Sequence, residues 1–225
     1  MQTKYTAISG QDPKNLPYDP KSSIQDQVEA SVTSSLHNLR YSDDANDNNA
    51  SYLDCLVLHS PLPTLALTME AWSAMSKHVP TSVRTLGISN VTLPVLEALY
   101  ERASVKPVVV QNRFHAATGY DVALRAFCTE HGITYQSFWT LTGNPSLLVA
   151  RVVVDFARAV GVAREVALYS LVLSLGGISI LNGTTTHAVS DLEDMQKVRE
   201  WRETGDNVTT WHEYTTAFEQ VINAH

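Results

Sequence analysis

The chain has 225 residues, of which 44% are hydrophobic, and its formal net charge is −7. This length and composition fit a single domain over residues 1–225 with one substantial core. The acidic balance and the lack of a basic stripe argue against a nucleic-acid partner, and no apolar run approaches the roughly 20 residues that a membrane helix requires. Because no signal-peptide pattern opens the sequence, we expect a cytoplasmic protein without membrane contact.

Apolar runs with the length of buried strands alternate with segments of helical period. Strands are expected at residues 2–4, 52–59, 83–88, 108–110, 132–137 and 178–181. This alternation is typical of parallel βα units. Each run ends on polar residues, as in a βα barrel, where the carboxyl ends of the strands face the active-site mouth. The predicted fold class is α/β, of the (β/α)8 TIM-barrel type.

Helix-start signals precede several of the helical segments. Ser22 with Gln25 and Ser190 with Glu193 fit capping boxes, and Thr92 can cap a third helix. Further helical segments are expected around residues 69–79, 124–128, 147–160, 164–175 and 211–222.

Two local features have plain structural interpretations. Residues 41–51 are rich in Asp and Asn, which favour turns, so this stretch is predicted to be a solvated loop. Cys55 and Cys128 lie in apolar or helical runs without metal-ligand spacing, which indicates two buried thiols in a reducing compartment.

Four short motifs at the strand ends carry a family resemblance. Gln2-Thr3-Lys4, Leu53-Asp54 with residues 58–61, Gly87-Ile88-Ser89-Asn90 and Val110-Gln111-Asn112 resemble the aldo-keto reductases, in family order over nearly the whole chain. Residues 135–139 and 181–184 are similar to a fungal-type branch of that family. The resemblance implies a barrel that binds a nicotinamide cofactor and transfers hydride to a small-molecule carbonyl, with a catalytic tetrad of Tyr, Lys, His and Asp.

Two members of the tetrad have counterparts here. Lys4 matches the lysine, whose ammonium lowers the pKa of the proton-donating tyrosine. His59 matches the histidine, which orients the carbonyl and stabilises the developing negative charge. Tyr5 cannot replace the family's tyrosine, because consecutive strand residues point to opposite faces.

In the family, the aspartate and tyrosine come from the second strand and its loop, upstream of residue 1. We therefore expect a barrel that lacks its N-terminal part and keeps about six βα units. Three interpretations follow. Met1 is internal to a longer protein, or a short chain closes its open edge against another copy as a homo-oligomer, or the scaffold has changed or lost its catalysis.

The resemblance also assigns a cofactor site. Ser89, Asn90 and Gln111 match the residues that bind the nicotinamide carboxamide. A flat amide needs both donors and acceptors, and Ser, Asn and Gln side chains supply both. Gln136, followed by Ser137, occupies the place where many relatives have a tyrosine that stacks on the ring, and Trp139 is an alternative cover for it. Where relatives have a Pro-Lys-Ser run that meets the 2′-phosphate, this chain has Leu181-Asn182-Gly183-Thr184, so NADP is expected with NAD left open. Backbone amides at Gly183 and Thr184 are candidates for phosphate binding.

Each candidate also has a structural interpretation. His59 fits a hydrogen-bonded core histidine, Lys4 a surface lysine, and Ser89-Asn90 a turn that leads into a helix. Asp54, early in its strand, is expected to be structural. No metal site is expected, because the other histidines singled out share no ligand spacing: His115, His131 and His187.

The sequence therefore predicts an NADP-linked aldo-keto reductase-type oxidoreductase acting on a small carbonyl compound. By analogy with relatives that have similar sequence motifs, we expect a role in fungal secondary metabolism. Two other functions stay open. One is a non-redox isomerase or cyclase on the same scaffold, which uses Lys4 and His59 for proton transfer. The other is a catalytically inactive interaction subunit.

Overall fold

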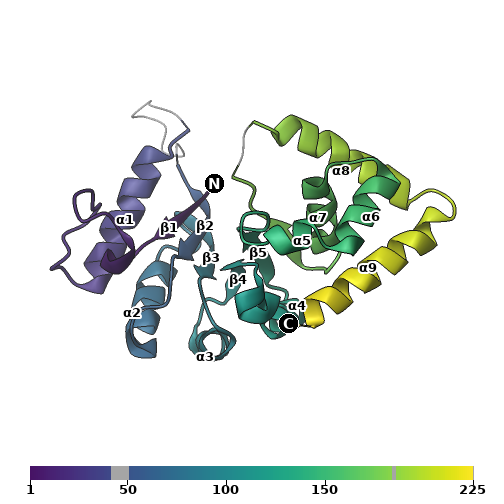
Figure 1. Ribbon diagram of the computed structural model, residues 1–225. Helices are drawn as coiled ribbons and strands as arrows, with labels where there is room; N and C mark the ends of the chain where they lie inside the picture. The colour runs from purple at the N-terminus through teal and green to yellow at the C-terminus, as the bar shows by residue number, and fades with distance from the viewer. Residues whose placement is uncertain (42–50, 184–185, 225) are drawn as a thin grey trace. The chain divides into compact units, whose positions relative to one another are not determined.

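The computed structural model describes residues 1–41, 51–183 and 186–224 (Figure 1). The chain forms two compact units, Met1–Gln111 and Asn112–His225. Most of the predicted Asp- and Asn-rich loop, residues 42–50, lies outside the described residues, as does Thr184.

A parallel sheet forms the centre of the first unit. Its strands follow one another in chain order: β1 (Gln2–Tyr5), β2 (Leu53–Leu58), β3 (Val83–Ser89) and β4 (Pro107–Arg113), the last of which runs two residues into the second unit. The register pairs Lys4 with Val57, and Ser89 with Gln111. The four predicted strands are confirmed, but β4 is longer than the expected 108–110 because its polar end stays in the ladder.

Apolar side chains of the strands and helices form the core of this unit. The helices are α1 (Ile24–Asn38), α2 (Leu65–Ser76) and α3 (Leu93–Arg102). Trp72 and Met75 of α2 are buried, as their helical spacing predicted, and the Trp72 indole N–H donates to the Val105 carbonyl at 2.8 Å. An indole N–H needs such a partner when it is buried.

The start of α1 corrects one sequence prediction. The N-cap is Ser23, not Ser22: the Ser23 Oγ accepts a hydrogen bond from the Asp26 amide at 3.2 Å and donates to the Asp26 carboxylate at 2.7 Å. The cap thus lies one residue further on than predicted, and Asp26, not Gln25, is the residue that bonds to the capping serine. A carboxylate in the first helical turn also interacts favourably with the helix dipole.

The second unit contains a parallel strand pair and helices. It comprises the short 3-10 segment Ala116–Asp121, α4 (Val122–Glu130), β5 (Thr134–Phe138), α5 (Pro145–Leu148), α6 (Arg151–Val160), α7 (Arg164–Leu173), β6 (Ile178–Ile180), α8 (Ala188–Arg202) and α9 (Asn207–Asn223). In β5 and β6, Tyr135 pairs with Ile178 and Ser137 with Ile180. The predicted helix 147–160 is wrong as one element, since it is interrupted between α5 and α6.

The second predicted capping box does not form. Helix α8 already begins at Ala188 after His187, which places Ser190 and Glu193 inside the helix. The Ser190 hydroxyl instead donates to the His187 carbonyl at 3.0 Å. A hydroxyl at this depth bonds locally to the backbone and caps nothing.

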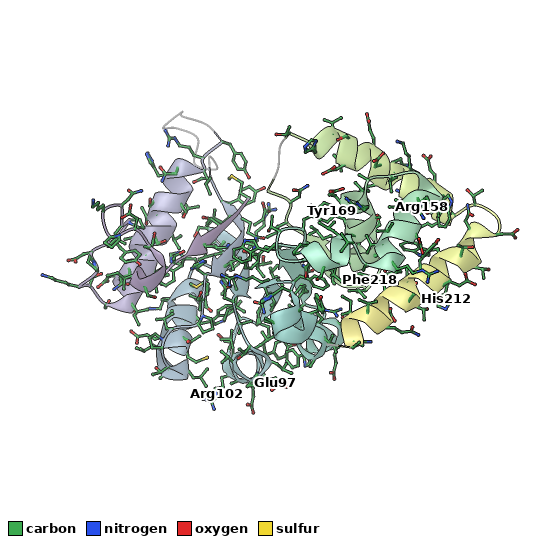
Figure 2. All side chains as sticks on the ribbon, in the orientation of Figure 1. Glu97, Arg102, Arg158, Tyr169, His212 and Phe218 are labelled. Atoms are coloured by element: carbon green, nitrogen blue, oxygen red, sulfur yellow. The ribbon has the colours of Figure 1, made fainter. Side chains whose placement is uncertain are left out.

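Aromatic side chains fill the core of the second unit. Phe156 of α6 has its ring centre 5.3 Å from that of Trp211 and 5.2 Å from that of Tyr214, both on α9. Phe218 of α9 is fully buried, whereas His212 on the same helix is exposed (Figure 2). This confirms the amphipathic closing helix that the sequence predicted.

Both cysteines are buried and free, as predicted. Among the described residues, no helix combines the length and the apolar character needed to cross a membrane.

Candidate active site at the strand ends

Lys4 and His59 lie at the carboxyl ends of neighbouring parallel strands. The His59 amide donates to the Tyr5 carbonyl at 2.9 Å, which continues the β1–β2 ladder by one residue. Burial lowers the pKa of the half-buried His59 imidazole, and the nearby Lys4 ammonium lowers that pKa further. Burial of part of the Lys4 side chain also lowers the pKa of its ammonium, although the residue as a whole is exposed. The arrangement favours a neutral imidazole beside a cationic lysine.

Ser89, Asn90 and Gln111 connect the next strand ends. The Ser89 hydroxyl donates to the Gln111 carbonyl at 2.6 Å, and the Asn90 amide N–H donates to the same carbonyl at 3.1 Å. The Asn90 side-chain amide donates to the His59 carbonyl at 2.9 Å and to the Ser89 hydroxyl at 3.2 Å. Hydrogen bonds thus join the histidine at the end of β2 to the polar ends of β3 and β4.

The geometry of Asn90 differs from that of a simple turn into a helix. Its φ of 52° lies in the left-handed region, which Asn tolerates better than most residues. The N-cap of α3 is Thr92, and the side chains of Ser89 and Asn90 bond toward the neighbouring strands. The side chains of both residues therefore form hydrogen bonds that link the ends of neighbouring strands.

Gly10 is a site neighbour that the sequence did not reveal. A Cβ atom built on it would lie 3.1 Å from His59 Nδ1 and 2.9 Å from Thr6 Cγ2. A side chain at this position would require the Thr6 methyl group and the His59 ring to shift, so glycine lets the backbone lie close to the imidazole without displacing it. The sequence marked Gly10 as the start of a turn-rich loop, and nothing in that pattern points to the histidine.

The structure places Tyr5 away from the site, as expected. Its hydroxyl donates to Gln27 of α1 at 3.3 Å, and burial raises its pKa to about 12. Asp54, at the start of β2, accepts a hydrogen bond from Arg84 at 2.9 Å. That position, at the opposite end of the strand from His59, agrees with a structural role.

The other candidates for cofactor binding belong to the second unit. Gln136 is half-buried on β5, and the buried Ser137 hydroxyl bonds to the Thr140 hydroxyl. Trp139 is 54% exposed and has a φ of 58°, and the Arg113 guanidinium carbon lies 4.3 Å from the centre of its ring. An exposed indole with a cationic neighbour remains able to stack on a further flat group.

The segment after β6 has few groups that favour binding of a phosphate. The Asn182 side chain donates to the Asp191 carboxylate at 3.2 Å, and Gly183 is exposed with open space around its Cα. Asp191 lies in the first turn of α8, where its negative charge opposes that of an incoming phosphate.

The histidines weighed as metal ligands, His115, His131 and His187, belong to no metal-binding cluster among the described residues. His131 Nδ1 is 2.9 Å from the Phe127 carbonyl oxygen, and its ring stacks on Phe127. Within residues 1–41, 51–183 and 186–224, no group of three His, Cys, Asp or Glu side chains could hold a metal ion.

Comparison with known proteins defines the class. The sequence model of the Aldo/keto reductase family matches residues 11–153, which is more than half of the chain. The chain therefore belongs to the aldo/keto reductase family.

Individual relatives agree with this. The chain is 30% identical over 129 residues to 2,5-diketo-D-gluconic acid reductase B of Corynebacterium sp. (strain SHS752001), a match that covers 57% of this chain and 46% of that protein. Its structure resembles that of aldose reductase from Giardia lamblia, with a TM-score of 0.63, 21% identity, and coverage of 96% of this chain and 74% of that one. It also resembles a mutant of Gox0644 in complex with NADPH, with a TM-score of 0.62, 20% identity, and coverage of 88% of this chain and 69% of that one.

These likenesses establish the aldo-keto reductase barrel type of fold, with parallel strands alternating with helices. The chain spans about half the length, or less, of the curated relatives it matches.

Proposed function

We propose that this chain takes part in NADP-linked reduction of a small carbonyl compound and that Lys4 and His59 are its catalytic residues. Membership of the aldo/keto reductase family supports NAD(P)H-dependent carbonyl reduction in general. The observation that carries the assignment to these residues is the hydrogen bond from the Asn90 side chain to the His59 carbonyl. It ties the proposed cofactor-binding pair Ser89-Asn90 to the proposed catalytic histidine.

The roles follow from the charge that develops on the carbonyl oxygen. A neutral His59 imidazole has one ring N–H to donate to that oxygen, and this neutral donor stabilises the developing charge without losing its own proton. The Lys4 ammonium adds positive potential at the same strand ends and favours ionisation of a neighbouring proton donor. The resemblance gives counterparts here for two members of the family's tetrad, so Lys4 and His59 are the tetrad members that we propose for this chain.

The donor set fits a nicotinamide cofactor, which supplies hydride when bound. Ser89, Asn90 and Gln111 offer hydroxyl and amide groups at adjacent strand ends, and a flat carboxamide needs both donors and acceptors. From the second unit we propose Gln136, Ser137 and Trp139 as contacts to the cofactor or substrate. Asn182, Gly183 and Thr184 are proposed for the phosphate end, where the absence of a lysine leaves NAD as an alternative.

Cofactor titration with a matched pair of variants tests this proposal. Asn90→Gly keeps the left-handed backbone accessible and removes only the side-chain amide. Loss of one or two hydrogen bonds should weaken NADPH binding about tenfold, measured by isothermal titration calorimetry. Asn15→Gly, in an exposed loop of the same unit, should leave binding unchanged. Equal affinity of Asn90→Gly and the unaltered chain would remove Asn90 from the site.

Turnover then separates the functions. The isomerase or cyclase alternative is favoured by one observation, the Lys4–His59 pair, because a base beside a cation suffices for proton transfer at a carbonyl. NADPH oxidation with an aldehyde panel supports the reductase, whereas cofactor binding without oxidation favours the alternative. Failure to bind cofactor favours the interaction subunit.

Three further expectations from the sequence stay predictions. They are a role in fungal secondary metabolism, a cytoplasmic location, and a homo-oligomer that covers an open barrel edge. The organisation as one domain over residues 1–225 is likewise proposed.

A further inference from the structure

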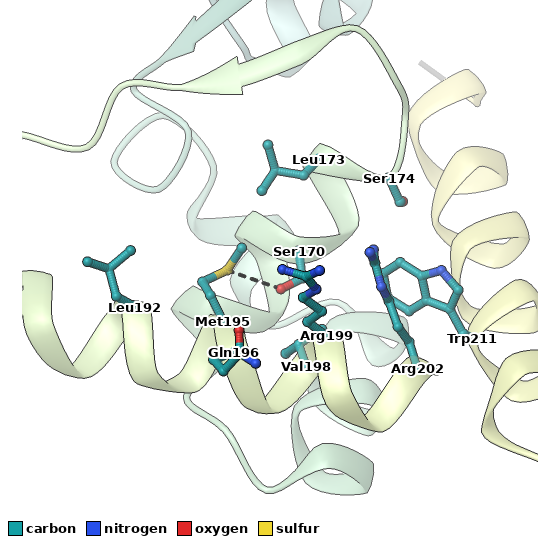
Figure 3. Close-up of a pocket in the computed structure, with 10 residues that line it drawn as sticks. All are labelled: Ser170, Leu173, Ser174, Leu192, Met195, Gln196, Val198, Arg199, Arg202 and Trp211. Atoms are coloured by element: carbon teal, nitrogen blue, oxygen red, sulfur yellow. Dashed lines mark hydrogen bonds between the residues drawn. The ribbon is translucent and has the colours of Figure 1, made fainter. Parts of the chain in front are cut away.

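A groove in the second unit is lined by residues to which the proposed function assigns no role. It has a volume of about 380 Å³ and is bordered by α7, α8 and α9 (Figure 3). This volume falls in the range of small-molecule sites, about 300–1,000 Å³. The carbonyl chemistry proposed above makes no use of it.

The lining of the groove is apolar, and its polar rim is cationic. Leu173, Met195, Val198 and Trp211 supply the apolar surface. A thioether adapts to irregular partners, and an indole offers a flat face. The groove therefore suits a ligand with a flat apolar body.

Two guanidiniums provide the charge. Arg199 and Arg202 are three residues apart on α8, so they share one face of the helix. Both line the groove, and Figure 3 shows the Arg202 side chain beside the Trp211 indole. The Arg202 guanidinium carbon lies 5.9 Å from the centre of the Trp211 ring system.

The hydroxyl groups of the lining are already engaged. Ser170 donates to the Val166 carbonyl at 2.8 Å, and Ser174 donates to the Leu171 carbonyl at 2.6 Å. These serines are therefore weak candidates for ligand recognition. The guanidiniums carry five N–H donors each, more than a single shared carboxylate can accept.

That carboxylate belongs to Glu203, the residue that follows α8. Its Oε1 lies 3.7 Å from Arg199 Nε and 3.9 Å from Arg202 Nη2, in pairs whose side chains are largely exposed. Exposed pairs of this length contribute little energy, so an incoming anion can displace Glu203 from them. The Glu203 pairs thus show that one carboxylate can reach both guanidiniums.

We propose that this groove binds an amphipathic organic anion, with its flat apolar body on Met195, Val198 and Trp211 and its carboxylate or sulfonate on Arg199 and Arg202. The apolar area supplies affinity, and the guanidiniums select the charge. Because the two arginines attract an anion and Glu203 repels it, removing the arginine charges should weaken anion binding and removing the Glu203 charge should strengthen it.

The probe is 1-anilinonaphthalene-8-sulfonate, and its uncharged counterpart N-phenyl-1-naphthylamine lacks only the sulfonate. The double variant Arg199→Gln/Arg202→Gln should bind the sulfonate about tenfold more weakly, measured by the rise in probe fluorescence. Glu203→Gln should bind it about two- to threefold more tightly. The matched control Arg158→Gln alters an exposed, ion-paired arginine of α6 (Figure 2) and should match the unaltered chain.

The location of binding is tested separately with ¹⁵N-indole spectra. The chain has four tryptophans, and Trp211→Phe identifies the Trp211 signal. Titration of the sulfonate should move that signal more than the Trp72 signal. Equal binding of the charged and uncharged probes, an unmoved Trp211 signal, or an unchanged affinity in the double arginine variant would each overturn the proposal.

Discussion

Gly87 of β3 is packed so closely that a single methyl group should disturb both the sheet and the site. A Cβ atom at this position would lie 2.9 Å from the Val109 carbonyl oxygen, 3.0 Å from Val109 Cβ and 3.3 Å from Val57 Cγ2. The nearest atom belongs to the backbone, so a change of rotamer cannot relieve the contact. Gly87→Ala should therefore push β3 and β4 apart.

Two opposing effects set the magnitude for Gly87→Ala. Replacing glycine restricts the unfolded chain and stabilises the fold by about 0.4–1 kcal/mol. Overpacking a close-packed core costs about 1–3 kcal/mol. The overpacking dominates because the carbonyl is held in the ladder, and a net loss of about 1–2 kcal/mol in the free energy of unfolding is expected.

Urea unfolding followed by circular dichroism measures this loss. Val108→Ala, at an exposed position of β4, is the matched control and should change stability by less than about 0.5 kcal/mol. Because Gly87 pairs with Val109 two residues before Ser89 pairs with Gln111, NADPH affinity should also fall in Gly87→Ala. A Gly87→Ala chain as stable as the original would refute the packing argument.

Three more predictions concern charge, capping and burial. The folded-state pKa of His59 lies below its ordinary value of 6.5, so the unfolded chain binds more protons near that pH and stability should fall as the pH is lowered. Lys4→Met removes the neighbouring charge and should raise the pKa of His59 measured by NMR. An unchanged pKa would contradict the pairing of Lys4 with His59. Ser23→Ala should cost about 1 kcal/mol of stability through loss of the α1 cap, whereas Ser190→Ala should cost much less, and thermal melts that rank the two the other way would disprove the cap assignment. Burial raises the pKa of the Cys128 thiol to about 12, so its reaction with Ellman's reagent should be slow until the chain unfolds, and a fast reaction in the native state would show that the thiol is accessible.

The strands were predictable because burial on both faces leaves continuous apolar runs. The residues at which the strands end were harder to predict, as β4 illustrates. Gln111 and Asn112 are polar but only 2% and 6% exposed, and the Gln111 carbonyl accepts bonds from Ser89 and Asn90. Hydropathy ends the strand at Val110, whereas the hydrogen bonds of its neighbour extend it.

The predictions of helix caps were wrong for a different reason. Adjacent serines at 22 and 23 both fit the start of a helix, and the choice depends on which hydroxyl reaches an amide three residues on. The Ser190–Glu193 pattern fits the same rule but lies inside a helix that begins earlier. A short local pattern has no access to the tertiary contacts that set where a helix begins.

Neither Gly10 beside His59 nor the groove of α7, α8 and α9 has a signal in the sequence. Each depends on residues that are distant along the chain and become neighbours only through folding. Family motifs identify residues at the strand ends, because members of the family share the chemistry of those positions. They carry no information about loops and helix surfaces. This is why the sequence predicted the polar residues at the strand ends and missed the groove.

The contacts at the strand ends link site geometry to sheet register. Ser89 and Asn90 bond to the Gln111 carbonyl, and the Asn90 side chain bonds to the His59 carbonyl. In each case the acceptor is a main-chain atom of a neighbouring strand, whose position is fixed by the ladder and not by a rotamer. A shift of one residue in any ladder would turn these side chains to the opposite face. The alignment of the polar groups is therefore set by the core below them, and a core change such as Gly87→Ala should affect cofactor binding although Gly87 itself need not touch the cofactor.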